Sequence, residues 1–85
     1  MAKAVVWSLR AKTDRRNILE YWHKRNKSKL YSRKLFRLFQ EAVQQISENS
    51  AIGKPTSLLE VRSYVVKDYL IFYENFKDHI LILTV

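Results

Sequence analysis

The sequence has 85 residues and a mass of 10.2 kDa, so we expect residues 1–85 to form a single domain with one thin core. Sixteen lysines and arginines against eight acidic residues give a net charge of +8, and 47% hydrophobic residues exclude a disordered tail. The sequence contains no cysteine, which excludes disulfides and thiolate metal sites. No stretch has the length and hydropathy of a signal peptide or a membrane span. These features predict a cytoplasmic protein that makes no contact with a membrane.

The first half of the chain predicts a strand followed by two helices. The β-branched and aromatic run at 4–7 is typical of a strand, and the Ser8 hydroxyl can cap a helix that extends from about residue 9 to 27. A polar turn at 26–29 then leads to a second helix, from about 30 to 49. The short turn predicts an antiparallel helical hairpin. The second helix has a core stripe at helical spacing, made by Leu35, Phe39, Ala42 and Ile46. Trp22 and Phe36 are expected to join this core.

The second half changes to the period of β-strands. The only glycine and the only proline, Gly53 and Pro55, end the helical half, and three runs rich in Val, Ile, Tyr and Phe follow at 61–67, 69–76 and 80–85. We therefore expect an α+β fold, with an N-terminal strand, an antiparallel helical hairpin and a three-stranded antiparallel meander. The expected result is a four-stranded antiparallel sheet with the helices on one face. The last strand reaches Val85 without a polar tail, which suggests that a further segment follows in the natural gene.

The excess positive charge lies entirely in the first half of the chain. Residues 1–50 contain twelve lysines and arginines against four acidic residues, whereas residues 51–85 contain four of each sign. A basic helical hairpin attracts nucleic acid or an acidic protein partner, although a solvated surface that keeps the protein soluble is the simpler interpretation.

Few residues are suited to catalysis. His23 and His79 are far apart in sequence and neither belongs to a metal-ligand spacing, so we expect no metal site and no cofactor. RNA cleavage by attack of an internal 2′-hydroxyl needs fewer specialised residues than metal-based catalysis, because cations and one proton acceptor suffice. The residues of the predicted sheet that could serve are Arg62, Tyr64, Lys67, Tyr69 and Tyr73. Arg62 and Tyr64 share one face of their strand, where Arg62 either binds a partner or pairs with Glu60 or Glu74.

Three stretches together resemble the RelE/ParE superfamily, the toxins of bacterial type II toxin–antitoxin systems. They are the opening Val6-Trp7-Ser8, the Ile18-Leu19-Glu20-Tyr21-Trp22 motif, and the run from Ile52-Gly53-Lys54-Pro55-Thr56 through Val61-Arg62 to Tyr69-Leu70-Ile71-Phe72-Tyr73. The resemblance implies the fold described above. Leu70 stands where the ribonuclease branch has an arginine, so the sequence is closer to the ParE branch. The basic C-terminal segment of both branches is missing.

The resemblance implies a toxin that inhibits DNA gyrase by binding, and that a cognate acidic antitoxin neutralises by covering an apolar groove. On this hypothesis Arg62, Tyr64 and Lys67 bind the target and no residue is catalytic. The alternative is a RelE-like endoribonuclease that cuts mRNA on the ribosome, with Arg62, Lys67 and Tyr73 as its catalytic residues. A homodimer and a toxin–antitoxin hetero-oligomer both remain open.

Overall fold

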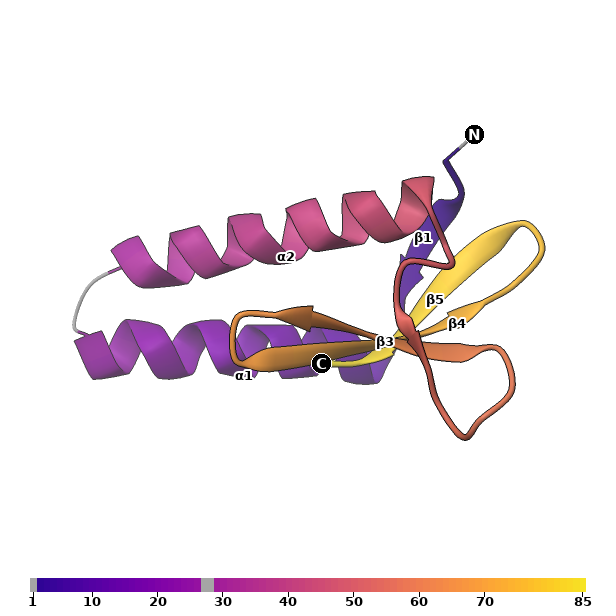
Figure 1. Cartoon of the computed structure of the whole chain (residues 1–85). Coiled ribbons are helices and arrows are strands. Elements are labelled where there is room, and N and C mark those ends of the chain that lie inside the picture. Colours follow the sequence, from indigo (N-terminus) through magenta and orange to yellow (C-terminus); the bar gives the residue numbers. More distant parts are fainter. Residues whose placement is uncertain (1, 27–28) are drawn as a thin grey trace.

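The computed structural model, which describes residues 2–26 and 29–85, begins with a strand, continues with two helices and ends with strands, as the sequence predicts (Figure 1). The elements in chain order are β1 (Ala4–Trp7), α1 (Leu9–Asn26), α2 (Leu30–Glu48), β2 (Lys54–Pro55), β3 (Val61–Val66), β4 (Tyr69–Asn75) and β5 (His79–Thr84). The α+β class is confirmed, and each predicted long element ends within a residue or two of its expected bounds. The predicted turn at 26–29 includes residues 27 and 28, which lie outside the described residues.

The sheet differs from the prediction in two respects. It has five strands in the order β1-β5-β4-β3-β2, and β1 runs parallel to β5, so the expected four-stranded antiparallel sheet is wrong. The additional strand is β2, which was expected to be loop; its two residues pair with Ser63 and Arg62 of β3. A strand this short has no periodicity to detect, and Pro55 is tolerated because β2 lies at the sheet edge.

The start of α1 is fixed by Ser8, as predicted. The backbone N–H of Ala11 donates to the Ser8 hydroxyl oxygen over 3.0 Å, which satisfies one of the free N–H groups of the first turn. The same hydroxyl donates to the carbonyl oxygen of Leu83 over 2.8 Å. Ser8 therefore caps the helix and ties its first turn to β5.

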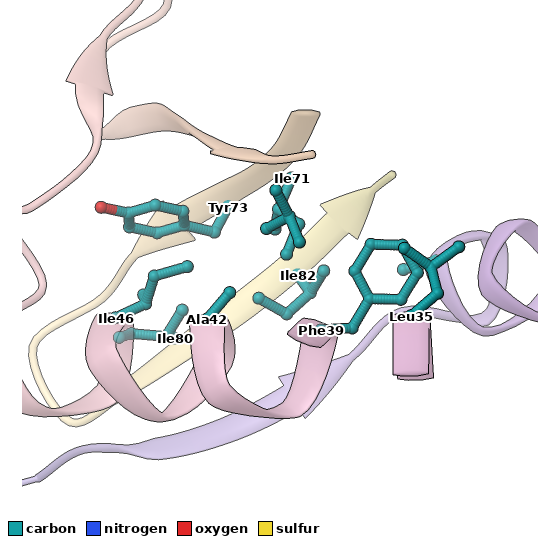
Figure 2. Packing of buried hydrophobic residues seen from close by; sticks show 10 residues of the cluster. Leu35, Phe39, Ala42, Ile46, Ile71, Tyr73, Ile80 and Ile82 are labelled. Carbon is teal, nitrogen blue, oxygen red and sulfur yellow. The ribbon is translucent and has the colours of Figure 1, made fainter. Parts of the chain in front are cut away.

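The core lies between α2 and the central strands. The predicted stripe of α2 is confirmed: Leu35, Phe39 and Ile46 are fully buried and Ala42 is nearly so. Figure 2 shows these side chains facing Ile71 and Tyr73 of β4 and Ile80 and Ile82 of β5. Because side chains alternate along a strand, the residues between these buried ones point to the other face of the sheet.

That other face is partly apolar and open to solvent. Val65 of β3 pairs with Leu70 of β4, and these side chains are 63% and 43% exposed. Val6 of β1 is also exposed. The helical hairpin therefore packs on one face of the sheet. In the described ranges neither helix is long and apolar enough to cross a bilayer.

Candidate functional site

Arg62 holds the segment that precedes β2. Its guanidinium donates to the carbonyl oxygen of Gly53 over 2.8 Å and to that of Ala51 over 3.4 Å. No ion pair with Glu60 or Glu74 is present among the described residues, so the predicted carboxylate partner is wrong. A guanidinium has five N–H donors, and these contacts leave some of them free for a partner.

Tyr73 is the residue of β4 that faces Arg62 across the β3–β4 ladder. Its side chain is fully buried, and its hydroxyl donates to the carbonyl oxygen of Ser50 over 2.8 Å while accepting from the N–H of Gly53 over 3.0 Å. Burial raises the pKa of the Tyr73 hydroxyl, although the Gly53 N–H and the charge of Arg62 both act in the opposite direction. The hydroxyl therefore anchors the loop after α2.

The other candidate tyrosines also bind within the protein. The Tyr64 hydroxyl donates to the side-chain oxygen of Gln45 in α2. The Tyr69 hydroxyl accepts from the indole N–H of Trp22 over 2.7 Å, and its ring packs edge-on against Phe39. Both residues thus join the sheet to the helical hairpin.

Arg62, Lys67 and Tyr73 do not come together as a set. Arg62 and Tyr73 are cross-strand neighbours, whereas Lys67 lies in the β3–β4 turn with a positive φ of 56°. Lys67 follows Arg62 by five positions, which in extended chain places the two residues about 16 Å apart. Lys67 is exposed, so it is available to a partner at a different end of β3 from Arg62.

A groove of about 600 Å³ lies between α1 and α2 on the surface of the hairpin. Leu19 and Phe36 form its apolar part, and basic residues surround them. The cationic residues of its lining are Lys12, Arg15, Arg16, Lys29 and Arg33, with Glu20 as the acidic one. An apolar groove with a cationic rim fits an amphipathic segment of acidic character.

An apolar groove was expected from the resemblance, but its place was not, because the spacing of Phe36 predicts a core residue. Phe36 is 36% exposed, since it lies one position beyond the buried Leu35 and is turned toward α1. The guanidinium of Arg15 lies 4.3 Å from the ring centroid of Trp7 and 5.5 Å from that of Phe36. Such cation–π contacts depend on which helix faces which strand, so no sequence spacing signals them.

A second open feature is the edge of β3. β2 pairs only with Arg62 and Ser63, so residues 64–66 have no strand on that side. Hollows lie on both sides of this edge, one of about 470 Å³ that includes Ile52 and Leu70 and one of about 260 Å³ that includes Leu38 and Lys67. Tyr64 and Val65 line both. An added strand would direct alternate side chains into the two hollows.

Within residues 2–26 and 29–85, no three His, Cys, Asp or Glu residues lie close enough together to bind a metal ion. The structure offers three surfaces as candidates for binding. These are the groove between the helices, the β3 edge, and the region around Arg62.

Comparison with known proteins agrees with this fold. The family model for the ParE toxin of the type II toxin–antitoxin system parDE matches residues 5–85. A solved structure of the chromosomal ParDE TA system from P. aeruginosa has the same fold, with a TM-score of 0.80 and 17% identity over 98% of this chain and 92% of that chain. No curated protein matches the chain. The resemblance to the ParE branch is thus confirmed, and the chain belongs to the family of ParE toxins of type II toxin–antitoxin systems.

Proposed function

We propose that the free chain inhibits DNA gyrase by binding to it, and that a cognate antitoxin neutralises the chain in the bacterial cytoplasm. The family match over residues 5–85 carries this proposal. Target contact would come from the surface around β3, where the predicted residues Arg62, Tyr64 and Lys67 lie.

The arrangement of the candidate catalytic residues favours binding over RNA cleavage. A general base or acid must reach its substrate, but the Tyr73 hydroxyl is buried and both of its hydrogen bonds go to the backbone. Lys67 lies at the far end of β3 from Arg62 and cannot share one scissile phosphate with it. Leu70 lies on the open face of the sheet, opposite to the face that carries Arg62 and Tyr73. The RelE-like alternative therefore has weaker support.

The antitoxin would bind the groove between α1 and α2. Leu19 and Phe36 would receive the apolar stripe of an antitoxin helix, and the carboxylates beside that stripe would meet Lys12, Arg16 and Arg33. A following extended segment could pair with the open β3 edge, since the hollows on both of its sides can take alternate side chains. Antitoxin binding would cover apolar surface and offset the positive charge together.

The test is to induce the chain without antitoxin in bacteria and to pulse-label DNA and protein synthesis at early times. Purified gyrase is assayed in parallel for loss of supercoiling and for accumulation of cleaved DNA. We expect DNA synthesis to fall first and cleaved complexes to accumulate. An early fall of protein synthesis, with gyrase unaffected, would instead support the ribonuclease.

A further inference from the structure

The loop between β2 and β3 presents two adjacent leucines to solvent. Leu58 is 64% exposed and Leu59 is 88% exposed. Figure 1 shows this loop extending beyond the sheet, on the side away from the C-terminal end of α1. Single exposed leucines are ordinary on protein surfaces, but two at the tip of one loop form an apolar projection.

Polar contacts, not burial of the leucines, fix the shape of this loop. The Thr56 hydroxyl donates to the carbonyl oxygen of Val61 over 2.9 Å and accepts from the N–H of Leu58 over 3.2 Å. The N–H of Val61 donates to the carbonyl oxygen of Leu58 over 3.2 Å, which closes a turn. Glu60 has a positive φ of 66°, and its carbonyl oxygen accepts from the N–H of Asn75 over 2.9 Å. These hydrogen bonds fix the backbone on both sides of Leu59.

Both sides of the tip are also attached to the sheet. Thr56 follows β2, which pairs with β3, and Arg62 holds the carbonyl oxygen of Gly53 just before β2. A hollow of about 240 Å³ lies behind the leucines and includes Pro55, Arg62 and Asn75 in its lining. A rigid apolar projection with a hollow at its base can insert into a partner and receive a partner side chain in return.

The charge of this region favours a protein partner over nucleic acid. Residues 51–85 have equal numbers of basic and acidic residues, and Glu60 is the single charged residue from Thr56 to Glu60. Nucleic acid is bound through cations along its phosphates, and the loop has none at its tip. The basic groove lies on α1 and α2 and shares no lining residue with the hollow behind the tip.

We propose that Leu58 and Leu59 insert into an apolar pocket of the protein that this toxin inhibits, and that Arg62 positions the loop that carries them. This proposal rests on the proposed function, because it assumes a protein target. In the proposed function the antitoxin occupies the groove and the β3 edge and leaves the tip uncovered. The tip is thus a contact for the target alone.

The test compares Leu58→Ser, Leu59→Ser and the double variant with Leu9→Ser, which changes a leucine that is 82% exposed at the start of α1. Growth arrest is measured at matched expression, and target inhibition, thermal stability and antitoxin affinity are measured on purified chains. We expect the double variant to lose about tenfold or more of its inhibitory potency, as for residues at the centre of an interface. Its melting temperature and antitoxin affinity should stay as in Leu9→Ser.

Four results would overturn the proposal: full arrest by the double variant, an equal loss in Leu9→Ser, a lower melting temperature, or weaker antitoxin binding. Membrane contact is tested with vesicles of phosphatidylethanolamine and phosphatidylglycerol. Binding to these vesicles that depends on both leucines would assign the tip to a lipid surface and reject a protein pocket. If the wild-type chain arrests growth without inhibiting gyrase, the gyrase proposal alone is refuted. The role of the leucines is still decided in that case, by comparing growth arrest by the tip variants with growth arrest by the wild type.

Discussion

The hydroxyl of Tyr73 lies 3.0 Å from the backbone nitrogen of Gly53 and accepts its hydrogen bond inside the protein. It also donates to the carbonyl oxygen of Ser50 over 2.8 Å. One buried side chain of β4 thereby holds two points of the loop between α2 and β2. This loop continues into β2 and the leucine tip, so the contact links the core to the surfaces proposed for binding.

Tyr73→Phe should destabilise the fold by about 1–3 kcal/mol, because it leaves a buried N–H and a carbonyl oxygen without their partner. For a domain of this size the melting temperature should fall by roughly 4–8 °C for each kcal/mol. Thermal unfolding followed by circular dichroism measures this. Tyr21→Phe is the control, since Tyr21 is exposed and the hydrogen bond of its hydroxyl with Arg25 is long, at 3.4 Å. Equal melting temperatures for the two variants would contradict the anchoring role.

Gly53→Ala should destabilise the fold more than Tyr73→Phe does, for a steric reason. An added Cβ would lie 2.7 Å from the Tyr73 hydroxyl oxygen and 2.8 Å from the carbonyl oxygen of Ser63. In the double variant with Tyr73→Phe, the clash with the hydroxyl disappears, but the clash with the Ser63 backbone and the 2.9 Å contact with the ring carbon Cε1, which phenylalanine keeps, both remain. We therefore expect the double variant to recover only part of the additional loss, measured by urea unfolding. Full additivity of the two changes would show that the hydroxyl and the glycine do not contact each other.

Tyr73 should also make stability depend on pH in the alkaline range. Its pKa is raised in the folded state by burial, so the folded protein holds this proton more tightly than the unfolded chain does. The stabilisation is complete below the unfolded pKa of about 10, and it is lost as pH rises through the folded pKa. The free energy of unfolding should fall as the pH rises past the unfolded pKa of about 10, and it should fall less in Tyr73→Phe. Absorbance of tyrosinate should show a tyrosine that ionises above the usual pKa of the residue and that is missing in Tyr73→Phe, and its absence from the wild type would refute the prediction.

Much of this fold could be predicted from local periodicity, because the helices and strands depend mainly on residues that are neighbours along the chain. The spacing of Leu35, Phe39, Ala42 and Ile46 specifies one buried face of a helix whatever that face meets, and the Ser8 cap acts within one turn. The parallel pairing of β1 with β5 joins residues about 75 positions apart, for which no local signal exists. Val6, for example, gives the same strand signal whether its neighbour is parallel or antiparallel.

The candidate site was predicted less completely, for the same reason. Arg62 was found because an arginine within a strand is unusual, and Arg62 does lie beside Tyr73. Its contacts with backbone carbonyls could not be foreseen, since they depend on how the chain returns from α2. The spacing of Phe36 predicts a core residue, but the packing of α1 against α2 places Phe36 in the lining of the groove. Leu58 and Leu59 gave no periodic signal, and only their exposure distinguishes them.

Lys67→Gln tests the proposed target surface without disturbing the fold. Lys67 is exposed in the β3–β4 turn, so loss of its charge should leave the melting temperature within about 2–4 °C while gyrase inhibition weakens severalfold, because a rim charge affects association more than stability. Lys77→Gln, in the next turn of the sheet, is the matched control. Supercoiling assays over a range of toxin concentrations compare the two. If both variants inhibit as the wild type does, Lys67 is not part of the target contact.

Charge removal within the groove should weaken antitoxin binding more than the same removal outside it. Arg16 and Arg33 line the groove, whereas Lys34 and Arg37 are exposed on α2 and do not. The variants Arg16→Gln/Arg33→Gln and Lys34→Gln/Arg37→Gln lose the same net charge, so long-range attraction falls about equally in both. Close pairing with antitoxin carboxylates is lost only in Arg16→Gln/Arg33→Gln. This variant should therefore bind the antitoxin about tenfold more weakly than Lys34→Gln/Arg37→Gln does, and its Kd should depend less on salt. Calorimetric titration at low and high salt measures both quantities, and equal effects in the two double variants would place the antitoxin outside this groove.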